Sequence, residues 1–267
     1  MVQMKQRILT GVLAAAVFLL AVIYGQMPFT LLIYLMGNVA LFELLRMKKI
    51  SIFSFPGIVS LILLWLLMGG ENSFFPNVDA SKMQIALFAV LILLTYTVLS
   101  KNSFTFDEVA FVILATLYIG VSFYYFIQIR GLYGMSAIFF AAVIIWSTDS
   151  GAYFIGKSMG KRKLWPEISP NKTVEGFIGG IVTAVVLSLV FQAVTGFLPS
   201  YLLVMFITLL LSIFGQLGDL VESALKRHYH VKDSGTILPG HGGILDRFDS
   251  FLFVLPFLYL LLATFAS

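Results

Sequence analysis

Residues 201–225 read YLLVMFITLLLSIFGQLGDLVESAL, an apolar run that carries charge only at Asp219 and Glu222. A helix rises about 1.5 Å per residue, so a run of this length crosses the roughly 30 Å hydrocarbon core of a bilayer. A charged side chain inside a bilayer is costly and marks a functional site by default. The stretch therefore predicts a membrane-spanning helix with a working carboxylate, and the fold class depends on how often such stretches recur.

The composition agrees with a membrane protein. Of the 267 residues, 60% are hydrophobic and 11% are charged, and the mean hydropathy is +0.99. A soluble domain carries about 25% charged residues, so this chain has too little charge to cover a surface that faces water. A soluble globular protein, a disordered chain and a nucleic-acid-binding domain are excluded. The absence of cysteine excludes disulfides and thiolate sites.

Nine apolar windows recur along the chain, and their length favours helices over the shorter alternating strands of a membrane β-barrel. The first window follows Lys5 and Arg7 but has no clear cleavage site, so we interpret it as an uncleaved span rather than a signal peptide. We expect an all-α polytopic membrane protein with about nine transmembrane helices. The windows cover residues 8–25, 28–45, 53–70, 84–100, 108–127, 134–156, 176–197, 201–225 and 249–266.

Lysine and arginine set the orientation, because they are enriched in cytoplasmic loops. With the N-terminus in the cytoplasm, all but two of the 17 basic residues fall on the cytoplasmic side, and only Lys82 and Arg130 lie outside. The two long polar loops, 157–175 and 226–248, are then cytoplasmic. For a bacterial chain, this pattern predicts a multi-pass protein of the cell inner membrane.

The unusual residues are concentrated in the second half of the chain. The first five windows are chemically bland, whereas the last four windows and their two loops hold most of the acids, glycines and paired basic residues. We therefore expect a transmembrane scaffold over residues 1–130 and a catalytic transmembrane region over residues 131–267.

Two carboxylates stand out within the predicted spans. Asp149 and Asp219 both lie six to seven residues from the inner end of their helix, which places them roughly 10 Å below the inner surface. Two carboxylates at one depth predict a shared site. Glu43, one turn from Arg46, is interpreted instead as half of an interfacial ion pair.

Helical spacing brings further groups to the same place. Asp219, Ser223 and Lys226 share one helix face, and Asp246 and Asp249 share another. Clustered carboxylate oxygens suit Mg²⁺, which also binds substrate phosphates, so Asp219, Asp246 and Asp249 are the candidate metal ligands. No histidine spacing in the chain supports a zinc site.

Both polar loops have features of phosphate sites. In the second loop, Gly242 and Gly243 allow close backbone approach to an anion, and Lys226, Arg227 and Arg247 offer positive charge. In the first loop, Asn171-Lys172-Thr173 stands just before a predicted helix start, where free amides favour anions. Residues 151–158 match a phosphate-loop pattern, but they end an apolar span rather than follow a strand, so we reject that role.

The segment from Ser223 to Asp249 resembles the signature of the phosphatidate cytidylyltransferase (CDP-diacylglycerol synthase) family. The pattern is S-x-x-K-R, then K-D, then P-x-H-G-G-x-x-D-R-x-D, with Lys226, His241 and Asp246 among its fixed positions. Segments 149–156 and 169–176 also resemble the family. The resemblance implies transfer of CMP from CTP to phosphatidic acid, which yields CDP-diacylglycerol and pyrophosphate for phospholipid biosynthesis.

Together, the residues and the resemblance suggest a set of roles. The expected cofactor is Mg²⁺, with a second cation such as K⁺ left open, and the expected partners are CTP, phosphatidic acid, membrane lipids and, as a homodimer, a second copy. Catalytic roles are assigned to Asp149, Asp219, Asp246 and Lys226. Substrate-binding roles are assigned to Asn171, Lys172, Thr173, Ser223, Arg227, His241, Gly242, Gly243 and Arg247.

Two other functions stay open at this stage. A CTP-dependent lipid kinase of the polyprenol type would use similar chemistry, and a cation or phosphate transporter would use the same membrane carboxylates. A CDP-alcohol phosphotransferase is excluded, because its motif needs an Asp-Gly pair and the chain has none.

Overall fold

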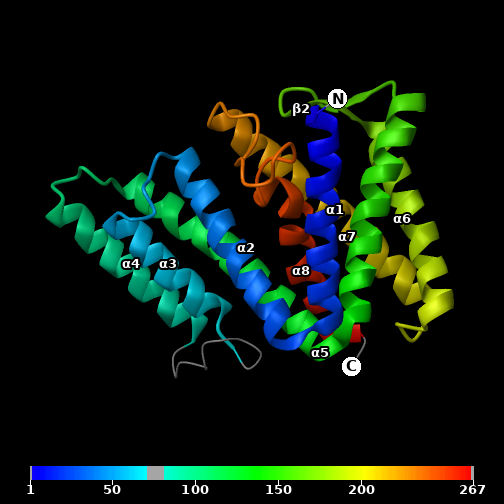
Figure 1. The fold of residues 1–267 in the computed structure, drawn as a ribbon, viewed down its shortest axis with the longest axis horizontal. Coiled ribbons are helices and arrows are strands. Elements are labelled where there is room, and N and C mark those ends of the chain that lie inside the picture. The colour runs from blue at the N-terminus through cyan, green and yellow to red at the C-terminus, as the bar shows by residue number, and fades with distance from the viewer. Residues whose placement is uncertain (1, 71–80, 266–267) are drawn as a thin grey trace. The chain divides into compact units, whose positions relative to one another are not determined.

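The computed structural model describes residues 2–70 and 81–265, with side chains from residue 9 onward. The side chains of Lys5 and Arg7 and residue 266 of the last predicted window lie outside this part of the chain. The elements, in order, are α1 (Val2–Tyr24), α2 (Gln26–Met47), α3 (Phe55–Met68), α4 (Lys82–Leu99), α5 (Phe106–Met159), β1 (Lys163–Trp165), β2 (Ser169–Thr173), α6 (Val174–Thr195), α7 (Tyr201–His228) and α8 (Leu245–Phe265) (Figure 1).

The predicted all-α membrane fold is confirmed. Each predicted window overlaps a helix, and within the described residues six helices are long and apolar enough to cross a membrane. The fifth and sixth windows share the 54-residue α5, whose helical geometry is interrupted at Gly134 with φ 76° and ψ −170°. Glycine adopts this left-handed φ without steric cost. The chain is thus a multi-pass membrane protein, and the count of nine spans stays a prediction.

A small hairpin was not predicted from the sequence. Strands β1 and β2 pair antiparallel, with Lys163 opposite Thr173 and Trp165 opposite Ser169. Pro166, which follows Trp165 directly, stands in the turn and favours it through its fixed φ. The hairpin therefore gives the first polar loop a defined shape between α5 and α6.

The first compact unit comprises Met1–Gly131 and Asp233–Asp246. In it, α2 contacts both α1 and α3, and α3 contacts α4. Leu63, Leu67 and Ala89 form a buried apolar cluster between α3 and α4. The functional division into a scaffold and a catalytic part stays a prediction.

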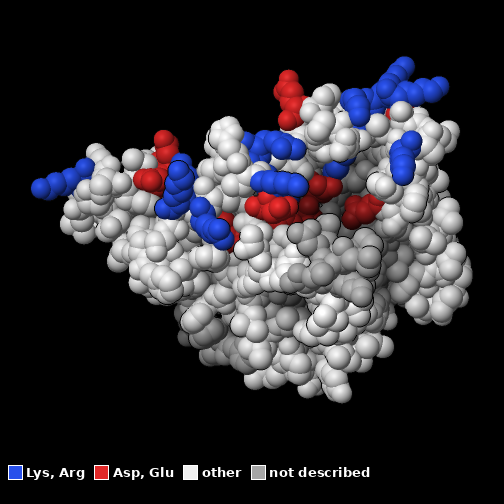
Figure 2. All heavy atoms as spheres, turned by 45° about the horizontal axis from the view of Figure 1, so that its top comes forward, with Lys and Arg blue, Asp and Glu red and all other residues white. Residues whose placement is uncertain are grey.

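The second compact unit comprises Leu132–Lys232 and Arg247–Ser267, and α6 and α7 form its most extensive helix contact. Along α6, Ile178, Val182, Val186 and Val190 recur every four residues, and each is more than half exposed. Such an apolar helix face is typical of contact with lipid. In Figure 2, charged side chains occupy only a small part of the visible surface of the described residues.

Candidate active site

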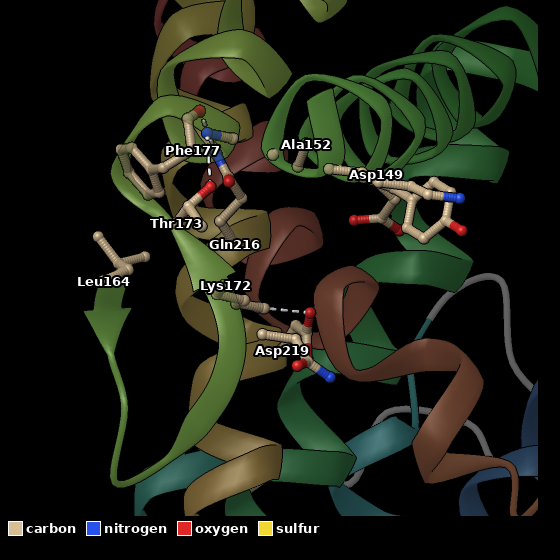
Figure 3. A pocket seen from close by; sticks show the side chains of 13 residues that line it. Asp149, Ala152, Leu164, Lys172, Thr173, Phe177, Gln216 and Asp219 are labelled. Carbon is tan, nitrogen blue, oxygen red and sulfur yellow. Dashed lines mark hydrogen bonds and ion pairs between the residues drawn. The ribbon is translucent and has the colours of Figure 1, made fainter. Parts of the chain in front are cut away.

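The second unit contains a pocket of about 460 Å³ between its helices and the hairpin. Its lining includes Asp149 from α5, Asn171, Lys172 and Thr173 from β2, and Asp219 from α7. In Figure 3, Lys172 and Asp219 point toward each other, while Asp149 enters from α5. The pocket thus brings together five residues that were selected from the sequence as candidate site residues.

Two of the residues that line this pocket form an ion pair. The Lys172 Nζ lies 2.5 Å from Asp219 Oδ2, with side-chain exposures of 27% and 34%. The Ser223 hydroxyl donates to the other carboxylate oxygen, Oδ1, at 3.4 Å. Because both groups remain accessible, a ligand that enters the pocket can contact either charge.

Two further carboxylates of the same unit lie near Asp219. Asp149 and Asp249 are both close enough to Asp219 to interact with its charge. A close helix approach places Asp249 there, because a Cβ at Gly218 of α7 would meet the Asp249 carbonyl oxygen of α8 at 2.7 Å. Small residues at helix contacts allow such an approach in membrane proteins.

The start of α6 supports the hairpin side of the pocket. Thr173 is the N-cap residue, and its hydroxyl accepts a hydrogen bond of 3.1 Å from the Gly176 amide. The predicted helix start after Asn171-Lys172-Thr173 is therefore confirmed. Glu175, in the first turn, accepts hydrogen bonds from the amides of Lys161 and Arg162. These bonds join the segment before β1 to the first turn of α6.

The basic end of α7 makes two contacts within the unit. Lys226 forms an ion pair with Glu222 one turn earlier, and the Glu222 side chain is only 2% exposed. Arg227 Nε donates to the Ile168 carbonyl oxygen in the hairpin at 3.3 Å. Arg247, on α8, is exposed. The substrate-binding roles of these cations stay predictions.

The segment 233–246, which we call the glycine loop, belongs to the first unit. Asp246 Oδ2 accepts hydrogen bonds of 2.8 Å from the amides of Ser234 and Gly243. Glu43 of α2 also contacts this loop and is only 2% exposed. The interpretation of Glu43 as an interfacial partner of Arg46 is therefore wrong.

The sequence comparisons agree with one another over the full length of the chain. A model of the "Cytidylyltransferase family" matches residues 5–265. A phosphatidate cytidylyltransferase of Bacillus subtilis is 70% identical and covers 100% of both chains. Phosphatidate cytidylyltransferases of Staphylococcus saprophyticus and Staphylococcus aureus are 49% and 46% identical and cover 97% of this chain and 99% of their own.

The chain belongs to the cytidylyltransferase family. It is therefore a nucleotidyltransferase, and the pocket in the second unit is the best candidate for its active site. The geometry there unites Asp149, Lys172 and Asp219 from three separate elements. His241, Gly242, Gly243 and Asp246 belong to the first unit, so their place in this cytidylyltransferase site stays a prediction.

The contacts of two acidic residues were not predicted from the sequence. Glu222 carried a weak signal, because an acid four residues before Lys226 on a helix predicts an ion pair. For Glu43 the sequence favoured Arg46 as the partner, and nothing in it pointed to contacts with residues about 200 positions away. Only the folded chain shows that Glu43 shapes the loop with the cytidylyltransferase signature.

A divalent cation fits the acidic side of the pocket. No three of the described His, Asp and Glu side chains gather around one metal position. Mg²⁺ needs only one or two protein carboxylates, however, when water and substrate phosphates complete its coordination. Asp219, which lines the pocket, and Asp249, whose charge interacts with that of Asp219, are the candidate pair. The triad with Asp246 stays a prediction.

Proposed function

We propose that the chain is a phosphatidate cytidylyltransferase, which transfers CMP from CTP to phosphatidic acid and releases pyrophosphate. The observation that carries the proposal is the accessible Lys172–Asp219 pair, held in a pocket of a membrane protein. The relatives of that name, matched over their full length, support the choice of substrates.

The reaction needs little acid or base catalysis. A phosphate oxygen of phosphatidate attacks the α-phosphorus of CTP, and the bond from that phosphorus to the oxygen bridging to the β-phosphate breaks. The electron pair leaves with pyrophosphate. Since the lipid phosphate is already an anion, positioning and charge stabilisation are the main requirements.

We assign different parts of this positioning and charge stabilisation to different residues. Lys172 would neutralise charge on the triphosphate, and Asn171 and Thr173 would bind near it, at the N-terminus of α6. Asp219 holds Lys172 in place and, with Asp249, would hold Mg²⁺. Bound Mg²⁺ would supply charge neutralisation on the phosphates of CTP. Asp149 would orient a substrate or a water molecule.

The same proposal places the enzyme in its cell. Phosphatidate would present its phosphate at the cytoplasmic face of the inner membrane, and CTP would arrive from the cytoplasm. The cytoplasmic N-terminus is supported by the distribution of Lys and Arg. A homodimer, which the sequence resemblance implies, is tested by the mass of the purified protein in detergent.

The first prediction concerns Asp219. In detergent with phosphatidate, labelled CTP and Mg²⁺, we expect Asp219→Asn to lower labelled CDP-diacylglycerol formation by about 100-fold or more, as for other lost transition-state contacts. The protein should stay folded, because partly exposed ion pairs contribute only about 0–1 kcal/mol. Glu167→Gln, at an exposed acid of the hairpin turn, is the matched control. Near-normal activity of Asp219→Asn would remove the residue from the mechanism.

The same assay separates the alternatives. A lipid kinase would release CDP and transfer only a phosphate to the lipid. A cytidylyltransferase releases pyrophosphate and transfers CMP, so a label in the cytosine base of CTP appears in the lipid. A transporter would do neither and would instead move ions into sealed vesicles. EDTA should abolish lipid labelling if Mg²⁺ is required, and exchange of K⁺ for Na⁺ tests the second cation.

A further inference from the structure

The most unusual side chain outside the pocket is Glu43 of α2, which is buried against the glycine loop. Its Oε1 accepts a hydrogen bond of 3.0 Å from the Ile244 amide, and its Oε2 accepts one of 2.9 Å from the Leu245 amide. The Ser234 hydroxyl lies 3.2 Å from the same Oε2. The side chain is thus held by both ends of the loop.

The contacts require a carboxylate at this position. Both oxygens accept from backbone amides, so a glutamine would turn its NH₂ group toward one of these donors. Leu245 is the first residue of α8, where helix amides carry partial positive charge. Among the described residues, no Lys or Arg pairs with Glu43. The loop itself therefore provides the groups that compensate the buried negative charge.

The loop glycines fit around this carboxylate. A Cβ at Gly235 or at Gly243 would collide with Glu43 Oε1, so neither position tolerates a side chain. The Gly243 amide, moreover, donates to Asp246. One of the two glycines that suggested phosphate contact is therefore needed for the approach of a protein carboxylate.

Glu43 and Asp246 hold the loop from two sides. The Ser234 hydroxyl lies between them, 3.2 Å from Glu43 Oε2 and 2.7 Å from Asp246 Oδ2. Gly243 and Ile244, which are adjacent in the chain, bond to Asp246 and Glu43 respectively. A change at Glu43 must therefore be transmitted to the position of the Asp246 carboxylate.

We propose that Glu43 is a positioning residue of the enzyme, which fixes the glycine loop so that Asp246 is presented correctly to Mg²⁺ and CTP. This inference rests on the proposed function, because it assigns Asp246 to the cation. It assigns Glu43 a role through the loop and no contact with substrate. The burial of Glu43 would then serve the precise placement of Asp246, since supporting contacts of metal ligands affect metal affinity and activity by about 10–100-fold.

The test measures the Mg²⁺ dependence of cytidylyl transfer by the full-length protein in detergent. For Glu43→Gln we expect the half-saturating Mg²⁺ concentration to rise by about 10-fold or more, with a lower kcat per folded molecule. Glu43→Asp keeps the charge but is one methylene shorter. Its half-saturating Mg²⁺ concentration should lie between those of Glu43→Gln and the wild type. Asp107→Asn, at an exposed acid of the same unit, is the matched control.

A merely structural role gives a different result. Glu43→Gln would then lower the melting temperature or the folded fraction, while folded molecules kept the wild-type Mg²⁺ dependence, and this outcome overturns the proposal. If Glu43→Gln does not fold, Ser234→Ala decides, because it removes only the hydroxyl between Glu43 and Asp246. We expect it to raise the half-saturating Mg²⁺ concentration several-fold, and an unchanged value overturns the proposal. Absence of cytidylyl transfer by the wild type would instead refute the proposed function.

Discussion

Two lysines of the second unit form ion pairs with carboxylates, and the two pairs differ in how exposed the acidic side chain is. Asp219, the partner of Lys172, has a side chain that is 34% exposed, whereas Glu222, the partner of Lys226, is 2% exposed. An exposed pair can open to admit a phosphate or a cation at little cost. A buried acid that loses its partner keeps an uncompensated charge. The Lys226–Glu222 pair therefore stabilises the end of α7, in addition to the predicted role of Lys226 in substrate binding.

This difference leads to a prediction for Lys226. Lys226→Met should destabilise the protein by about 3–5 kcal/mol, the cost of leaving one member of a buried pair alone. The double variant Glu222→Leu with Lys226→Met should recover most of that loss, since it removes both charges. Unfolding by denaturant in detergent measures the free energy of unfolding of the single and the double variant. A Lys226→Met variant as stable as the wild type would show that the pair does not support the fold.

At the level of elements, the contact of α7 with α8 decides where Asp249 lies. Gly215 and Gly218 are one turn apart on α7, and they differ in the space around them. A Cβ at Gly218 would lie 2.7 Å from the Asp249 carbonyl oxygen, whereas one at Gly215 would meet Val254 at an ordinary 3.4 Å. Of these two glycines, only Gly218 therefore requires a close approach of α7 to Asp249.

We predict opposite outcomes for alanine at these two glycines. Gly218→Ala should push α8 away from α7, cost about 1–3 kcal/mol through overpacking, and lower activity by displacing Asp249. Gly215→Ala should leave both the stability and the activity close to those of the wild type. Thermal unfolding and lipid labelling, measured on the same preparations, give both quantities. Equal behaviour of the two variants would contradict the close approach at Gly218.

The elements also show what the sequence can and cannot predict. The helices were predictable, because each apolar window is long enough to require a helix in lipid. The Lys172 site was predictable in part, since Thr173 is a typical N-cap residue. The hairpin was missed, because β1 has three residues and a polar sequence carries little strand signal. Glu43 was missed, because its partners Ser234, Ile244 and Leu245 are distant in the chain.

For the molecule as a whole, the two basic residues that depart from the cytoplasmic pattern each have an acceptor within the first unit. Arg130 Nε donates to the Val22 carbonyl oxygen near the end of α1 at 2.7 Å. Lys82 Nζ donates to the Gly69 carbonyl oxygen after α3 at 2.7 Å. Helix C-termini carry partial negative charge and favour cations. Both residues therefore have a structural reason to lie on the predicted outer side, and they do not weaken the proposed orientation.

The orientation can be tested directly, because the chain contains no cysteine and any introduced thiol is unique. Lys163→Cys lies in the hairpin, and Thr195→Cys lies at the opposite end of α6 at an exposed position. In intact cells, a membrane-impermeant maleimide should label Thr195→Cys and should label Lys163→Cys only after the membrane is permeabilised. Labelling of Lys163→Cys in intact cells would invert the orientation and place the pocket away from cytoplasmic CTP. Both variants should retain cytidylyl transfer, which confirms that the labelled molecules are folded.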